Sequence, residues 1–163
     1  MRKLIIELIA AAALTAAAIL ALAPGARASD IVVTGAFARA SATPAARTAS
    51  VYLSLTNRGT VPDRLVALAS AAARRAEVHE TVTEDGVMKM RAAASIDLPP
   101  GSTVALAPGG RHIMLSVLVS PLIRGASVEL TLTFETAGEV KVMVPIAGVA
   151  ADRPDQAGGS SGG

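Results

Sequence analysis

The side chains best suited to bind a soft metal ion lie close together in this sequence. Both histidines, and three of the four methionines that follow the initiator, fall within residues 79–114, and the chain contains no cysteine. These residues are His79, Met88, Met90, His112 and Met114. Imidazole and thioether together suit copper, and Cu(I) in particular, whereas zinc prefers cysteine, histidine and carboxylate ligands. The pattern therefore predicts a copper site.

A β-hairpin is predicted around Asp85-Gly86, because this dipeptide favours a tight turn between two alternating strands. With a two-residue turn, His79 lies diagonally across from Met90; with a four-residue loop, it lies directly opposite. Either register places both donors on one face, whereas a three-residue loop would separate them. Met88 shares this face but lies nearer the turn, so it is either a structural neighbour or an occasional ligand.

The second half of the predicted site is a His-x-Met sequence in a single strand. His112 and Met114 are two residues apart, so they share one face of that strand. Ile113 and Leu115 take the other face, which is the face expected to enter the core. The donor pair is therefore predicted to point outward. Met143 has no other donor near it in sequence, and no role is assigned to it.

The hydrophobic pattern predicts an all-β fold, because short alternating runs are separated by Gly, Pro and Asp and no long helical period occurs. We expect a single domain with the architecture of a β-sandwich. Strands are expected at 31–38 (as one or two strands), 51–56, 63–70, 76–83, 87–92, 102–106, 112–118, 128–134 and 140–146.

The N-terminus has the features of a secretory signal peptide. Arg2 and Lys3 precede an apolar run over 4–23, and Ala26-Arg27-Ala28 fits a cleavage site. An uncleaved anchor is the alternative, because about 20 apolar residues can span a bilayer. We expect a cleaved signal peptide at 1–28, a copper-binding domain at 29–150 and a disordered Gly/Ser-rich tail at 151–163.

Charge and composition argue against several functional classes. Without residues 1–28 the chain keeps 12 basic and 12 acidic residues, so the basic patch of a nucleic-acid-binding protein is not expected. A blue-copper electron carrier needs a cysteine thiolate, and the chain has none. Outside the Gly/Ser-rich tail, no Gly-x-Ser-x-Gly motif of a serine hydrolase occurs. We therefore expect a protein that is not an enzyme.

The spacing of the donors resembles the signature of the PCuAC family of periplasmic copper chaperones: His, ten residues, Met, twenty-one residues, His-x-Met. His79 and Met90 enclose ten residues here, and Met90 and His112 enclose twenty-one. Similarity extends over about 31–146. Two features differ: no additional methionine follows His79 closely, and the tail has no His or Met for a second copper ion.

The resemblance implies a cupredoxin-like Greek-key β-sandwich that binds one Cu(I) through His79, Met90, His112 and Met114. It also implies delivery of copper toward the CuA centre of cytochrome c oxidase, directly or through Sco-type proteins. We expect the mature protein to be periplasmic and monomeric. Transfer would proceed by stepwise ligand exchange. One alternative is a copper buffer or scavenger without a dedicated acceptor. Another is a metal-free adhesion or assembly module.

Overall fold

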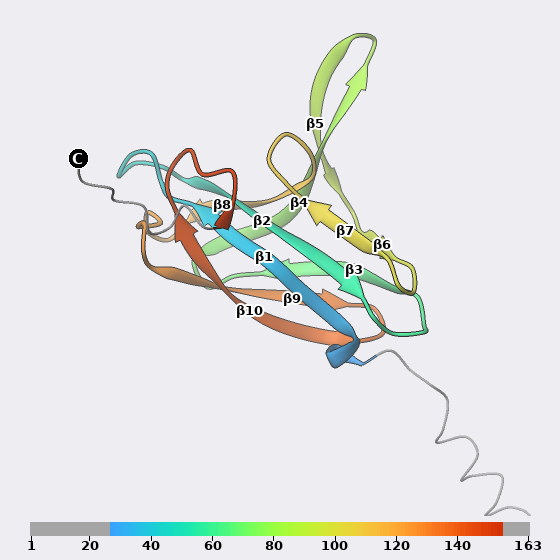
Figure 1. The fold of residues 1–163 in the computed structure, drawn as a ribbon. Coiled ribbons are helices and arrows are strands. Elements are labelled where there is room, and N and C mark those ends of the chain that lie inside the picture. The colour runs from blue at the N-terminus through green and yellow to red at the C-terminus, as the bar shows by residue number, and fades with distance from the viewer. Residues whose placement is uncertain (1–26, 155–163) are drawn as a thin grey trace, which may run out of the picture.

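The computed structural model describes residues 27–154, which form almost entirely β-structure (Figure 1). A short 3-10 helix, η1 (Ala28–Asp30), precedes ten strands. The strands are β1 (Ile31–Arg39), β2 (Thr48–Asn57), β3 (Asp63–Ala69), β4 (Ala73–Glu84), β5 (Val87–Ala93), β6 (Ile96–Leu98), β7 (Thr103–Leu106), β8 (His112–Leu118), β9 (Ser127–Phe134) and β10 (Gly138–Ala147). The sequence did not predict β6, which is only three residues long.

The strands follow one hydrogen-bonded order, β5-β4-β8-β2-β1-β10-β9-β3-β6, and β7 pairs with β2. The parallel pairing of β1 with β10 joins two layers, one containing β2, β4, β5, β7 and β8 and the other containing β3, β6 and β9 (Figure 1). The predicted all-β sandwich is confirmed.

The core lies between the two layers and is built by alternating residues. On β2, Val51, Leu53 and Leu55 are buried, and on β9, Leu130 and Leu132 are buried. Because successive side chains of a strand point to opposite faces, the residues between them form the outer faces of the layers. The histidines and methionines of interest lie on one such outer face.

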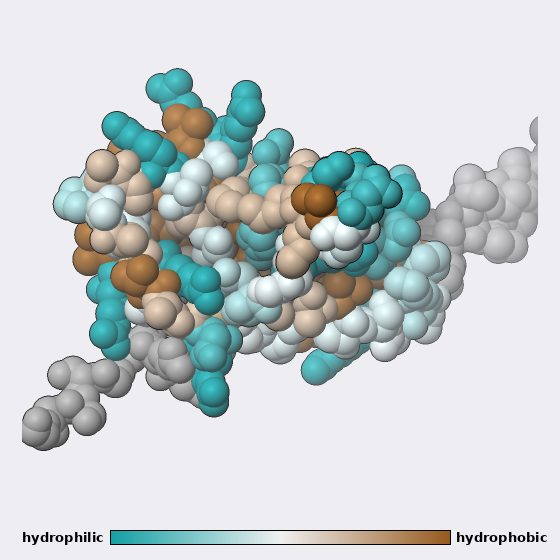
Figure 2. Space-filling model, turned by 90° about the horizontal axis from the view of Figure 1, so that it is seen from above, coloured by the Kyte–Doolittle hydropathy of each residue, from teal (hydrophilic) through white to brown (hydrophobic). Residues whose placement is uncertain are grey.

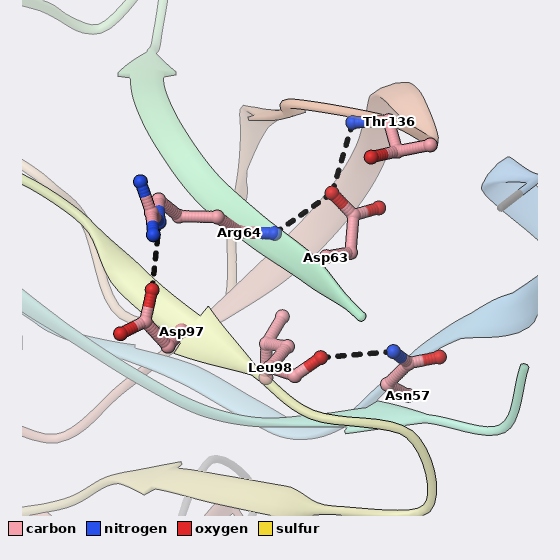
Figure 3. A network of polar contacts seen from close by, with 6 residues as sticks. All are labelled: Asn57, Asp63, Arg64, Asp97, Leu98 and Thr136. Atoms are coloured by element: carbon pink, nitrogen blue, oxygen red, sulfur yellow. Dashed lines mark hydrogen bonds and ion pairs between the residues drawn. The ribbon is translucent and has the colours of Figure 1, made fainter. Parts of the chain in front are cut away.

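Asn57 is the polar centre of one end of the sandwich. Its side chain is fully buried, and its amide nitrogen donates to the carbonyl oxygen of Leu98 (Figure 3) and to that of Val61, both at 2.9 Å. Its side-chain oxygen accepts from the Gly59 amide, also at 2.9 Å. Buried polar groups need such partners, so Asn57 ties the end of β2 and the following turn to β6.

A second buried polar side chain, Asp63, fixes the turn between β9 and β10. Its carboxylate accepts from the backbone amides of Arg64 at 2.7 Å and Thr136 at 2.9 Å (Figure 3), and from that of Ala137 at 2.9 Å. Three amide donors compensate for the removal of this charge from water. Asp63 therefore connects the start of β3 to a segment more than 70 residues away in sequence.

The described chain reaches beyond the predicted end of the domain at residue 150. Ala151 is buried in a small cluster with Phe37, Tyr52 and Ala147, and its carbonyl oxygen accepts from Arg39 Nε at 2.8 Å. The tail predicted from residue 151 onward therefore begins as packed structure, and residues 155–163 lie outside the described part. Of the predicted signal peptide, residues 1–26 also lie outside it, and cleavage stays a prediction.

Val117, near the end of β8, adopts a φ of 56°. This left-handed conformation is unfavourable for a β-branched residue by about 1–2 kcal/mol. We expect Val117→Gly to raise the free energy of unfolding by about 0.5–1 kcal/mol, after the entropic cost of glycine. Urea unfolding measures this. Val119→Gly, at an exposed position without a positive φ, is the control and should gain nothing; equal losses in both variants would contradict the expectation.

Candidate metal centre

Antiparallel pairing of β4 with β8 places His79 directly opposite His112. The two ring centroids are 6.0 Å apart, with an angle of 59° between the ring planes. Two imidazoles that bind one ion through bonds of about 2 Å have centroids about 5–6 Å apart. The observed spacing therefore suits a shared metal ion without rearrangement of the strands.

The hairpin between β4 and β5 has the two-residue turn that was one of the two favourable alternatives. Glu84 pairs with Val87 across Asp85-Gly86, and Thr81 pairs with Met90. Asp85 and Gly86 both have positive φ, as a type I′ turn requires. Because His79 pairs with Ala92, Met90 lies diagonally across from His79 on the same face.

Met114 completes the predicted set from the other side of the histidine pair. It pairs with Glu77 on β4 and with Ser50 on β2. Along the strands, Met114 therefore lies on one side of the histidine pair and Met90 on the other. An ion bound by all four side chains would receive one nitrogen from each imidazole and one thioether from each side of the histidine pair.

The alternation of β8 turns this donor set away from the core. Ile113 and Leu115 are fully buried, whereas His112 and Met114 are only half-buried. The hairpin β4–β5 extends beyond the sandwich (Figure 1), and Met90 on it is 58% exposed. The site consequently has a partly enclosed half, formed by β4 and β8, and an open half, formed by β5.

Two other methionines occupy different positions. Met88 pairs with Thr83, so it shares the face of Met90 but lies farther toward the hairpin tip, where it is 72% exposed. Met143 is also exposed, but it lies on β10 opposite Glu129 of β9, a strand that contributes nothing to the site. Met88 therefore remains a candidate neighbour or ligand, and Met143 provides a natural control.

The ring nitrogens of the two histidines have different surroundings. His112 Nδ1 lies 3.1 Å from the carbonyl oxygen of Gly110. His79 Nδ1 is buried without a hydrogen-bond partner in the described structure, and His79 Nε2 lies 3.6 Å from a carboxylate oxygen of Glu77. An unpartnered buried nitrogen is unfavourable unless a ligand satisfies it. The site therefore fits a metal ion bound by His79.

Within residues 27–154, no group of three or more His, Cys, Asp or Glu side chains is arranged to hold a metal ion. A site made only of nitrogen and carboxylate ligands is thus not supported in this part of the chain. A metal bound between His79 and His112 would need the thioethers to complete its shell, and this requirement favours copper over zinc.

The opposite face of the hairpin carries paired charges. Arg111 Nε donates to Glu80 Oε2 at 3.0 Å, and Glu84 forms ion pairs with Lys89 and Arg91. These acidic residues are structural partners of basic ones, as solvated hairpin charges are expected to be. Exposed pairs contribute only about 0–1 kcal/mol each. Because Lys89 and Arg91 lie on this opposite face, the face of β5 that carries Met88 and Met90 has no charged side chain.

Sequence reasoning missed the contact that Tyr52 makes with the site. The centroid of its ring lies 6.2 Å from that of His112. The alternation of β2 placed Tyr52 on an outward face, but no local signal linked it to His112. The contact follows from the pairing of β2 with β8, which joins distant parts of the chain.

Comparison with known families and proteins gives a consistent result. The model of the LpqE-like family, described as "Putative lipoprotein LpqE-like", matches residues 31–146. A protein of Leifsonia xyli subsp. xyli (strain CTCB07), described as "Putative lipoprotein Lxx21020", is 37% identical over 124 residues, which are 76% of this chain and 73% of that protein.

Solved structures, two of which are PCuAC domains, resemble the β-sandwich. The apo PCuAC domain of PmoF2 is 31% identical, with a TM-score of 0.62, and the match covers 76% of this chain and 94% of that domain. The copper-bound PCuAC domain from PmoF2 is also 31% identical, with a TM-score of 0.61 and coverage of 72% and 92%. Apo-DR1885 from Deinococcus radiodurans is 29% identical, with a TM-score of 0.56 and coverage of 77% and 84%. The similarity to PCuAC domains indicated by the sequence is confirmed.

Proposed function

The chain belongs to the LpqE-like family and shares its fold with PCuAC domains, and from this premise we propose that it is a periplasmic copper chaperone. It binds one Cu(I) through His79, Met90, His112 and Met114. The observation that carries this proposal is the direct pairing of His79 with His112 on an outer face, with His79 Nδ1 buried and unpartnered.

The surroundings of each ring select the nitrogen that binds copper. His112 donates its Nδ1 proton to the Gly110 carbonyl, which leaves the lone pair of Nε2 for the metal. In His79 the Nε2 proton faces the Glu77 carboxylate, so Nδ1 is the ligand atom. Glu77 thereby acts as an outer partner that orients the first imidazole.

Ligand exchange begins at Met90 in this proposal. Met90 is the most exposed of the four ligands and lies on the projecting hairpin, so an incoming ligand can displace it first. Viewed from the side toward which the hairpin projects, hydrophobic residues form small separate groups among hydrophilic ones (Figure 2). This surface suits a brief encounter with an acceptor better than a permanent interface. The acceptor that we propose is the CuA subunit of cytochrome c oxidase or a Sco-type protein.

The proposed location is the periplasm. The family description contains the word lipoprotein, but lipids linked through sulfur need a cysteine, and this sequence has none. In the described part of the chain, no helix has the length and apolar character to cross a membrane. Export through the predicted signal peptide is the route that accounts for a periplasmic protein.

The test is titration of the reduced protein with Cu(I) against a competing chelator, alongside Met90→Leu and Met88→Leu. We expect tight one-to-one binding that weakens by at least about tenfold in Met90→Leu, because even outer partners of metal ligands cost about 10–100-fold when lost. Met88→Leu should bind like the unmodified protein. If Met88 can replace Met90, the double variant will bind more weakly than Met90→Leu.

Met143→Leu is the matched control, since it removes an equally exposed thioether from a strand remote from the site. Binding that survives in Met90→Leu but is lost in Met88→Leu would move the ligand to Met88. Absence of competitive Cu(I) binding by the unmodified protein would overturn the proposed function.

A further inference from the structure

Four aromatic side chains form a continuous row across the outer face of the layer that holds the site. Neighbouring strands β1, β2, β8 and β4 contribute one ring each: Phe37, Tyr52, His112 and His79. Successive ring centroids are 5.0, 6.2 and 6.0 Å apart. The row runs from a buried apolar end at Phe37 to the proposed metal ligands at its other end.

The buried end of this row is covered by residues 148–154, which we term the C-terminal segment. Ala151 of this segment packs with Phe37, Tyr52 and Ala147 in a cluster separate from the main core. In Figure 1 the segment, in red, lies beside the end of β1. Tyr52 is consequently only 5% exposed, although its strand position places it on the outer face.

Arg39 connects the C-terminal segment to the tyrosine. Its Nε donates to the Ala151 carbonyl oxygen at 2.8 Å, and its guanidinium carbon lies 5.3 Å from the centre of the Tyr52 ring. This is the distance of a cation–π contact. Tyr52 is therefore held by Phe37, by Arg39 and by the covering segment, and its remaining ring contact is with His112.

We propose that Tyr52 is a positioning residue that holds the His112 ring in its metal-binding orientation, and that the C-terminal segment supports it. The torsion that turns a histidine ring is broad and intrinsically weakly restrained. The Gly110 carbonyl restrains His112 at Nδ1, and the fixed Tyr52 ring restrains it from the side. His112 then binds copper without first being ordered. The inference rests on the proposed function and adds a residue and a segment to it.

The arrangement gives the site one fixed half and one open half. His112 is held by a supported ring, whereas Met90 lies on the exposed hairpin. In stepwise exchange, the fixed ligand is the last to leave. Loosening Tyr52 should therefore weaken equilibrium binding by disordering His112, and it should do so without any change in the metal ligands themselves.

The experiment compares Tyr52→Leu, Tyr52→Phe and Phe134→Leu. Cu(I) affinity is measured by chelator competition, and the His112 ring is followed through its imidazole ¹⁵N signals in the metal-free protein. We expect affinity to fall roughly tenfold in Tyr52→Leu, as for the loss of an outer partner of a ligand. Tyr52→Phe keeps the aromatic ring and should therefore bind Cu(I) with the affinity of the unmodified protein. Phe134→Leu removes a buried ring from β9 and should lower stability while leaving affinity unchanged.

Two results would overturn the inference: unchanged affinity in Tyr52→Leu, or His112 ¹⁵N signals identical to those of the unmodified protein. If the unmodified protein binds no Cu(I), the proposed function fails first, and the ¹⁵N signals still report whether Tyr52 fixes the ring. If Tyr52→Leu does not fold, Arg39→Met replaces it. Losing the cation–π contact and the hydrogen bond to the Ala151 carbonyl should weaken binding about threefold. No change in affinity or in the ¹⁵N signals would overturn the inference.

Discussion

The double substitution His79→Ala with His112→Ala should abolish high-affinity copper binding. In the proposed site each histidine supplies one of the two nitrogen ligands, and the two residues lie opposite one another on paired strands. Loss of an outer partner of a metal ligand costs about 10–100-fold in affinity, so loss of both nitrogen ligands should cost well over about 100-fold. Cu(I) competition titration measures the loss, and copper should no longer raise the melting temperature of the variant.

The same variant should remain folded in the absence of copper. His79 Nδ1 has no hydrogen bond to lose, and neither histidine belongs to the buried core. We therefore expect the free energy of unfolding of the metal-free protein to change by less than about 1 kcal/mol. Removal of the unpartnered nitrogen acts to raise this free energy. Circular dichroism and urea unfolding provide this control. Retention of copper affinity in the folded variant would contradict the proposed site, because copper would then be bound by ligands other than the two histidines.

Asn57→Ala should produce the largest loss of stability among single changes outside the apolar core. It would remove three hydrogen bonds made by a fully buried side chain to Gly59, Val61 and Leu98. A buried group left without its partner costs about 1–3 kcal/mol, and the Leu98 carbonyl lies deepest of the three. We expect the free energy of unfolding to fall by about 3 kcal/mol, measured by urea unfolding.

Thr56→Ala is the matched control for this prediction. Its hydroxyl bonds that of Thr103 at 2.8 Å, but on the exposed face of the same strand, where water can replace it. The loss should be below about 1 kcal/mol. Because the Asn57 network lies at a different end of the layer from the proposed copper ligands, folded Asn57→Ala should bind Cu(I) with the affinity of the unmodified protein. A loss of stability no larger than that of Thr56→Ala would contradict the role given to Asn57.

The proposed site divides between two kinds of structural support. His79 and His112 lie on strands in the interior of a layer, and their neighbours Glu77, Gly110 and Tyr52 contact or approach the rings. Met90 lies on β5, which in the described part of the chain is an edge strand paired with β4. A chaperone must bind tightly enough to carry copper and still release it. In the proposed site, the ligands on interior strands provide tight binding, and the exposed ligand on the edge strand allows release.

Local chemistry allowed the sequence to determine much of this architecture. Alternation with a period of two identified most strands and the faces that Ile113 and His112 would occupy. Asp85-Gly86 identified the hairpin, because both residues tolerate the positive φ of its turn. The spacing of histidines and methionines indicated copper from ligand preference alone. The first two signals depend on residues a few positions apart, and the third depends on the types of residue within 79–114.

Only the tertiary structure decided which strands lie side by side. The pairing of His79 with His112, the contact of Tyr52 with His112 and the burial of Ala151 all join residues far apart in sequence. The choice between a two-residue and a four-residue turn also needed the structure, because both turns place His79 and Met90 on the same face of the hairpin. Strand order and register follow from how the whole chain buries its apolar residues, and no short stretch of sequence contains that information.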